Sequence, residues 1–222
     1  YLLVRTDPDA PKHDGITFLV ADLHEPGIEV RPIRQITGGS EFSEVFLSWV
    51  RIPVANAIGP INQGWNVATS TLGFERVGQS RTHRIERRLD ILVGMCESEG
   101  PDGRRPIDDP LVADQLVGFA ARVEALREIA ARATAAGVRG KAPGPESSVA
   151  KLLTSEVDQQ MANFGLDVAG VSGTLERDSP GAAKKGNVAK SYLLMRAATL
   201  GAGTSEIQRN VIGQKLLGLP RD

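Results

Sequence analysis

Several features that this sequence lacks limit what the protein can be. A single cysteine, Cys96, excludes an internal disulfide and fits a reducing compartment. The formal net charge is only -1, which argues against nucleic acid as the main partner. No apolar run reaches the length of a membrane span and no signal peptide is visible, so we expect a cytoplasmic protein, or a mitochondrial matrix protein if the source is eukaryotic. No set of histidines, cysteine and carboxylates has metal-ligand spacing.

The first part of the chain has the pattern of β-strands. Residues 16–23 form an apolar, β-rich run, and residues 27–36 and 43–53 alternate apolar with polar side chains. Pro32 inside the second of these segments predicts an edge strand or a bulge. Because Tyr1 enters a strand-like segment without any lead-in, we expect the chain to be part of a longer protein.

After Gly59-Pro60 the apolar period changes to that of helices. Residues 63–100 have helical spacing, and a second helix is predicted to begin with Asp109 as N-cap and Pro110 at its first position. A third helix follows the break at 137–146. The predicted inner faces of the three helices carry Ile85, Leu89, Leu92, Cys96; Val112, Leu116, Phe119, Val123, Leu126, Ala130; and Val149, Leu153, Val157, Met161, Phe164.

The last part of the chain predicts two further helices. A short helix covers 187–199, and the final one begins at Thr204 or Ser205, where Ser205 and Gln208 have the spacing of a capping box. Short loops between long helices favour an antiparallel four-helix bundle. The predicted fold is therefore mainly α, with strands of an incomplete barrel-like β-domain before the bundle.

The Gly-rich segment 201–206, GAGTSE, leads directly into the final helix. Glycine lets the backbone approach a ligand closely, and the first N–H groups of a helix attract anions or carbonyl oxygens. Thr204 and Ser205 add hydroxyl donors, and Glu206 adds an acceptor. An ordinary capped helix after a glycine loop accounts for the same residues.

Three segments together carry a resemblance to a known family. The C-terminal stretch GAGTSEIQRNVIGQKLLGLPR resembles the signature of the acyl-CoA dehydrogenase family, and so do RPIRQITGGSEFSEVFLSWVRIP and GPINQGWNVATSTLGFER. The resemblance implies an N-terminal helical domain, a central β-domain and a C-terminal helical domain. Residues 1–57 would then be the end of the β-domain and residues 58–222 the helical domain. Without the preceding parts, the chain is expected to be incomplete and inactive alone.

The resemblance also implies an activity, that of a flavoprotein oxidoreductase of fatty acid and lipid metabolism. A carboxylate removes the α-proton of an acyl-CoA thioester, and a hydride passes from the β-carbon to N5 of FAD. An electron-transferring flavoprotein would then receive the electrons. In many members the base is a Glu just before the Gly-Thr of the last motif, but this sequence has Ala202 there. The alternative family position, a Glu-Arg pair on the first helix, matches Glu75 and Arg76.

Glu75 is therefore the predicted general base, with Arg76 near the thioester. On residue chemistry alone, Glu75 would be an ordinary solvated glutamate of a long helix.

By the same resemblance, Thr204, Ser205 and Glu206 are expected to contact FAD, and Gly203 the substrate carbonyl. Gly170 lies in a loop that approaches the FAD of the neighbouring subunit in the family. Two departures from the family pattern in that loop leave a plain turn as an equal alternative.

Two other functions remain open from the sequence. The protein could be a non-catalytic partner subunit of a heteromeric acyl-CoA dehydrogenase, because the base is missing at Ala202. It could also be a flavin monooxygenase relative of the same fold, which needs no α-proton base. The expected assembly is a homodimer or tetramer, or a heteromer with a sister chain, and the length and shape of the acyl group stay undetermined.

Overall fold

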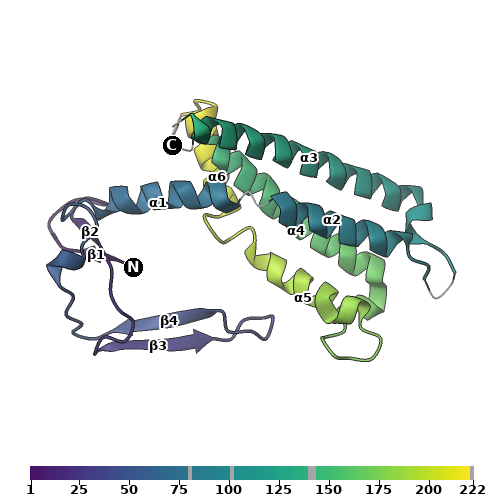
Figure 1. Cartoon of the computed structure of the whole chain (residues 1–222), viewed down its shortest axis with the longest axis horizontal. Coiled ribbons are helices and arrows are strands. Elements are labelled where there is room, and N and C mark those ends of the chain that lie inside the picture. Colours follow the sequence, from purple (N-terminus) through teal and green to yellow (C-terminus); the bar gives the residue numbers. More distant parts are fainter. Residues whose placement is uncertain (80–81, 101–102, 140–143, 221–222) are drawn as a thin grey trace. The chain divides into compact units, whose positions relative to one another are not determined.

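The chain is mainly helical, with two small antiparallel sheets near its start (Figure 1). The computed structural model describes residues 1–79, 82–100, 103–139 and 144–220, and for 73–79 it describes the backbone only. By the contacts of its backbone the chain divides into two compact units, Tyr1–Phe74 and Glu75–Asp222. Each unit is described by itself below.

The first unit contains both sheets. β1 (Leu2–Arg5) pairs with β2 (Ile16–Leu19), and β3 (Ile28–Ile33) pairs with β4 (Phe42–Leu47), each pair antiparallel. β3 has β4 as its sole partner within the described ranges, so Pro32 lies in an edge strand, which confirms that prediction. The three predicted strand segments thus correspond to β2, β3 and β4.

α1 (Gly64–Gln79) begins in close contact with β2. A Cβ on Gly64 would lie 2.2 Å from the Phe18 backbone nitrogen, so glycine permits the close approach. Trp65 stacks on the His13 ring, with centroids 4.0 Å apart. The sequence predicted one helix across 63–100, whereas the structure describes α1 and then α2; the junction at 80–81 lies outside the described residues.

Three long helices form the core of the second unit. α2 (Thr82–Glu97), α3 (Pro110–Val138) and α4 (Glu146–Ala169) pack against one another in pairs. Their inward faces are the predicted stripes, and the buried cluster consists of Ile85, Leu92, Cys96, Leu116, Phe119, Val123, Leu126, Val157, Met161 and Phe164. Burial of each large side chain stabilises the fold by about 1.5–3 kcal/mol, so this cluster contributes substantially to the stability of the second unit.

The predicted start of α3 is confirmed. The Asp109 carboxylate accepts a hydrogen bond of 2.9 Å from the Leu111 N–H, and Pro110 occupies the first helical position. Asp109 thereby satisfies one of the orphan donors of the first turn.

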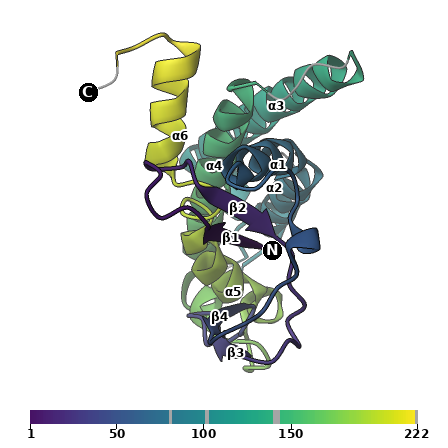
Figure 2. The same cartoon turned by 90° about the vertical axis from the view of Figure 1, so that its left-hand side faces the viewer.

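Two short helices complete the second unit by packing on α4. α5 (Asn187–Leu194) is shorter than the predicted 187–199, because a 3₁₀ turn over Met195–Ala197 ends it. α6 (Ser205–Val211) continues into a π-helical turn over Ile212–Leu216 and lies beside α4 in both views (Figures 1 and 2). None of the described helices is long and apolar enough to cross a membrane.

Candidate functional site

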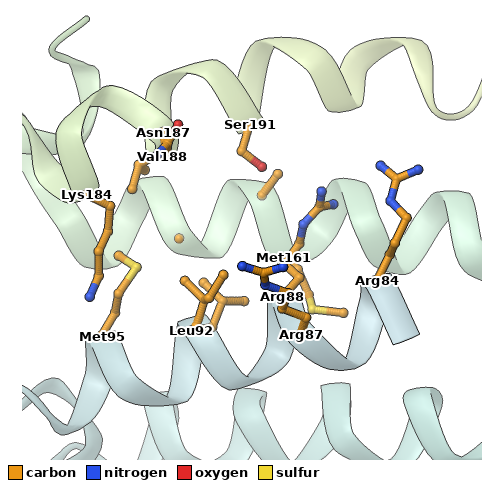
Figure 3. Close-up of a pocket in the computed structure, with 13 residues that line it drawn as sticks. Arg84, Arg87, Arg88, Leu92, Met95, Met161, Lys184, Asn187, Val188 and Ser191 are labelled. Carbon is orange, nitrogen blue, oxygen red and sulfur yellow. The ribbon is translucent and has the colours of Figure 1, made fainter. Parts of the chain in front are cut away.

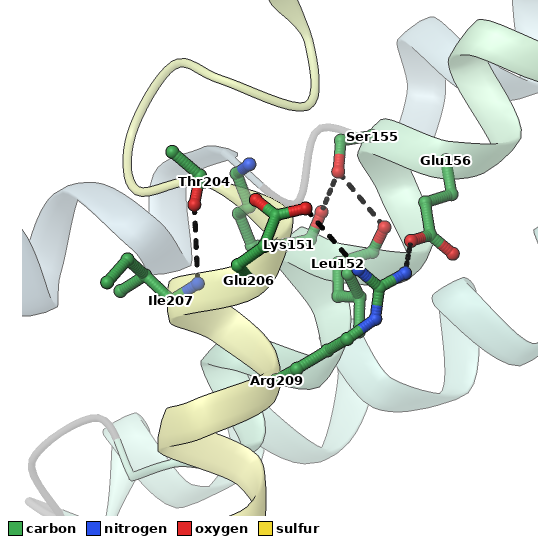
Figure 4. Close-up of polar contacts among 8 residues, drawn as sticks. All are labelled: Lys151, Leu152, Ser155, Glu156, Thr204, Glu206, Ile207 and Arg209. Carbon is green, nitrogen blue, oxygen red and sulfur yellow. Dashed lines mark hydrogen bonds and ion pairs between the residues drawn. The ribbon is translucent and has the colours of Figure 1, made fainter.

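The loop before α6 is closed by its own hydrogen bonds. Thr204 is the N-cap: its Oγ1 accepts a hydrogen bond of 3.3 Å from the Ile207 N–H (Figure 4). Ser205 is instead the first residue of the helix, and its buried hydroxyl has no partner among the residues that the structure describes. The predicted capping box at Ser205 and Gln208 is therefore wrong, because the cap lies one residue earlier.

Gln208 binds the loop in a different way. Its side chain is fully buried, and Nε2 donates to the carbonyl oxygens of Ala202 and Gly203, each at 3.2 Å. Gly203 has φ +90°, and a Cβ there would lie 2.5 Å from Nε2 of Gln208. Ala202 also has positive φ, +55°, which is unfavourable for a residue with a side chain. The glycine is thus required both by its backbone angle and by the amide packed against it.

A buried lysine ties α4 to the same loop. Lys151 is only 5% exposed, and its Nζ donates to the Ala198 carbonyl at 3.3 Å. Burial lowers the pKa of Lys151, against the opposing effect of Glu206 and Glu156. The ammonium group of Lys151 therefore lies against the backbone before α6, with the carboxylates of Glu206 and Glu156 near it.

The surface above Lys151 carries a short network of charges (Figure 4). Arg209 of α6 pairs with Glu156 of α4, and its other nitrogen lies 3.8 Å from Glu206. The pKa of Glu206 is lowered by a hydrogen bond from its own backbone N–H and next by the Thr204 hydroxyl. An ionised carboxylate and a hydroxyl donor therefore lie side by side at the exposed start of α6.

These groups fit a flavin nucleotide, which offers hydroxyl donors and carbonyl and phosphate acceptors. The Thr204 oxygen caps the helix and its hydroxyl hydrogen-bonds the Glu206 carboxylate, so the exposed Glu206 is the acceptor that remains open to a ligand. The Ser205 hydroxyl has no partner among the described residues, but it is buried and is not presented at the surface beside Glu206. The start of α6 therefore presents the Glu206 carboxylate to a ligand, and contacts of Thr204 and Ser205 with FAD stay a prediction.

The other predicted site residues are not brought to this loop by any described contact. Glu75 and Arg76 belong to α1 by their backbone, but their side chains lie outside the described residues. Gly170 ends α4 with φ +54°, and a Cβ there would meet nothing within 4 Å. The exposed position of Gly170 and the free space around its Cα fit a ligand contact and a plain turn equally well.

Sequence reasoning missed Lys151 and the role of Gln208. One signal for Lys151 was present: Ser148, Lys151 and Ser155 recur at helical spacing, and all three are buried. The Ser155 hydroxyl donates back to the Lys151 carbonyl at 2.9 Å, so this polar stripe is satisfied partly within α4. Nothing in the local sequence indicated that Gln208 would turn toward the carbonyls before its own helix.

The second unit and the end of the first match a known family model. The model is the acyl-CoA dehydrogenase C-terminal domain, and it matches residues 62–217. Acyl-CoA dehydrogenase IpdE1 of Mycolicibacterium smegmatis is 35% identical over 100% of this chain and 54% of its own length. The chain thus spans about half the length of this relative.

Two solved structures share the fold over the whole chain. The ChsE4-ChsE5 complex from Mycobacterium tuberculosis has a TM-score of 0.86 and 33% identity, and this chain covers 57% of the matched chain. The Tcur3481-Tcur3483 steroid ACAD has a TM-score of 0.88 and 27% identity, with 56% of that chain covered. The chain therefore belongs to the acyl-CoA dehydrogenase family, and residues 62–217 correspond to its C-terminal domain.

Proposed function

We propose that the full-length protein is an FAD-dependent acyl-CoA dehydrogenase, an oxidoreductase that acts on a CH–CH bond. Membership of the family is the observation that carries the proposal. The exposed, ionised carboxylate of Glu206 at the start of α6 supports it, because it can accept hydrogen bonds from the hydroxyl groups of a flavin nucleotide. The activity belongs to the whole protein, of which this chain supplies the helical part of the site.

In this proposal Glu75 is the general base. Its carboxylate takes the α-proton of the acyl-CoA thioester, and Arg76 balances the charge near the thioester. The backbone at Gly203 lies near the thioester carbonyl, which is the arrangement that acidifies the α-carbon. FAD, when bound, accepts the hydride that leaves the β-carbon.

Other residues of the chain hold the cofactor. Thr204, Ser205 and Glu206 bind polar groups of FAD at the start of α6, and Gly170 approaches the FAD of a neighbouring subunit. The backbone of the loop is braced from below by Gln208 and Lys151. Such bracing keeps the positions of reacting groups constant, on which catalysis depends strongly.

The remaining features of the proposal concern the whole protein. Residues 1–57 are the end of a β-domain built as an incomplete barrel, and residues 58–222 form an antiparallel four-helix bundle domain. An electron-transferring flavoprotein accepts the electrons in the cytoplasm, and the protein assembles as a homodimer or tetramer.

Anaerobic flavin reduction tests the base. Addition of a matching acyl-CoA to the full-length protein should bleach the flavin absorbance, and Glu75→Gln should abolish the bleaching. Glu128→Gln, at an exposed position of α3, is the control and should bleach like the parent. Bleaching of Glu75→Gln at the parental rate would contradict the assignment.

A double variant strengthens this test. Many family members carry the base at the position of Ala202, so Glu75→Gln with Ala202→Glu should recover part of the bleaching. Recovery would show that a carboxylate beside Gly203 reaches the α-carbon.

A second candidate function is that of a partner subunit in a heteromeric enzyme. Ala202 favours it, because a methyl group cannot take a proton, and both solved structures named above are assemblies of two differently named chains. Purification of the full-length protein alone, with flavin bound and full activity as a homo-oligomer, would exclude this function. The substrate panel should include a steroid-derived thioester, since the second structure is named a steroid enzyme.

A further inference from the structure

A cavity lies between α2, α4 and α5, entirely within the second unit. Its volume is about 340 Å³, and it is partly open to solvent. Its apolar lining comes from Ile91, Leu92, Met95, Met161, Ala162, Gly165 and Val188. None of the residues that line it belongs to the loop before α6, so it is separate from the candidate cofactor contacts.

Four cationic side chains surround this apolar space. Arg84, Arg87 and Arg88 come from α2, where positions three and four apart share a face. Lys184 comes from the turn before α5, and Figure 3 shows Lys184 and Arg84 at opposite ends of the cavity. No Asp or Glu is among the lining residues that the structure describes.

The charge is only partly neutralised. Arg88 pairs with Asp158 of α4, whose pKa is raised by burial against the opposing attraction of Arg88 and Arg84. Within the described ranges, the side chains of Arg87 and Lys184 have no hydrogen-bond or ion-pair partner. One carboxylate, Asp158, thus lies among four cations, three of them on exposed side chains, so the cavity carries a net positive charge.

The turn that carries Lys184 has an unfavourable backbone. Lys184 and Lys185 have φ of +47° and +55°, and Gly186 follows at +76°. A left-handed conformation costs about 1–2 kcal/mol for each residue with a side chain. Gly186 cannot be replaced cheaply, because a Cβ there would lie 2.4 Å from the Arg177 nitrogen. Such strain persists only where the surrounding structure holds it, and it is common at ligand-binding sites.

We propose that this cavity binds a phosphorylated ligand with an apolar body. A phosphate dianion matches the uncompensated charge, and arginine forks suit its oxygens. The apolar body would lie on Leu92, Met95 and Met161, with Asn187 and Ser191 at the rim as hydrogen-bonding groups. The proposal does not depend on the dehydrogenase activity.

Hexyl phosphate is a probe that combines both features. Isothermal titration of the flavin-loaded, full-length protein in a phosphate-free buffer should show one site for hexyl phosphate. Inorganic phosphate and 1-hexanol should each bind at least roughly ten-fold more weakly, because each lacks half of the recognised chemistry. Binding should also weaken as salt is added, since part of it is electrostatic.

Variants assign the binding to this cavity. Arg87→Gln and Lys184→Gln should each weaken hexyl phosphate binding about ten-fold or more, the effect of losing one charge-assisted contact. Both side chains lack described partners, so thermal unfolding should be nearly unchanged. Arg132→Gln, at an exposed position of α3, should bind like the parent.

Three results would overturn the proposal. The first is no detectable binding of hexyl phosphate, and the second is parental affinity in both Arg87→Gln and Lys184→Gln. The third is release of flavin by hexyl phosphate, which would locate the probe at the cofactor site. The titration measures binding of hexyl phosphate and not oxidation of acyl-CoA. A failure of the proposed dehydrogenase activity would therefore leave the titration unchanged, and a failed titration would leave the proposed activity untouched.

Discussion

Replacement of Gly203 by alanine tests the architecture of the loop before α6. Two independent costs act at this position. The residue has φ +90°, and a Cβ would lie 2.5 Å from Nε2 of the buried Gln208. The amide of Gln208 would have to move, which breaks its bonds to the carbonyls of Ala202 and Gly203.

The magnitude follows from these two costs. The left-handed backbone costs about 1–2 kcal/mol for alanine, and loss of two hydrogen bonds costs about 1–3 kcal/mol. Restriction of the unfolded chain by alanine offsets about 0.4–1 kcal/mol. Gly203→Ala should therefore lower the free energy of unfolding by about 2–4 kcal/mol.

Gly181→Ala is the matched control. Gly181 has φ +79° in the same unit, but a Cβ there would meet nothing within 4 Å. It should cost only the backbone part, about 1 kcal/mol or less. Urea unfolding of the full-length protein, followed by circular dichroism at fixed flavin concentration, measures both, because a ligand that binds the native state shifts apparent stability.

A double-mutant cycle separates the two costs. In a Gln208→Ala background the collision and both hydrogen bonds are already gone, so Gly203→Ala should cost no more than Gly181→Ala. The reasoning would be refuted if Gly203→Ala and Gly181→Ala lowered the free energy of unfolding of the parent equally. It would also be refuted if the effects of Gly203→Ala and Gln208→Ala simply added in the double variant.

Two further predictions concern α3 and α4. Asp109→Ala should lower the free energy of unfolding by about 1 kcal/mol, because the Leu111 N–H loses its cap. The control Asp114→Ala, at an exposed position of α3, should change the free energy of unfolding by less than about 0.5 kcal/mol. Thermal unfolding measures both variants. Burial lowers the pKa of Lys151 from its ordinary 10.5, so the unfolded chain binds this proton more tightly. The free energy of unfolding should then rise with pH between the folded pKa and 10.5, and Lys151→Met should remove that rise; identical pH profiles for parent and variant would contradict this.

The helices and strands were largely predictable from the sequence because their signals are local. The apolar stripes of α2, α3 and α4 repeat every three to four residues, and burial of Leu92, Cys96 and Met161 follows directly from that period. The start of α3 was predictable for the same reason, since Asp109 caps a nitrogen only two residues away. Glu75 and Arg76 remain predictions that depend on resemblance to the family.

The contacts that shape the two candidate sites depend on parts of the chain that are far apart. Lys151 is buried because its amine reaches the carbonyl of Ala198, and no local pattern specifies that pairing. The cavity likewise exists only because folding brings Lys184 opposite Arg84 and its neighbours on α2. Periodicity and capping act within one or two helical turns and can be read along the chain. The position of a charge relative to a distant carbonyl or a distant arginine is determined by how the helices pack, and therefore by the tertiary structure alone.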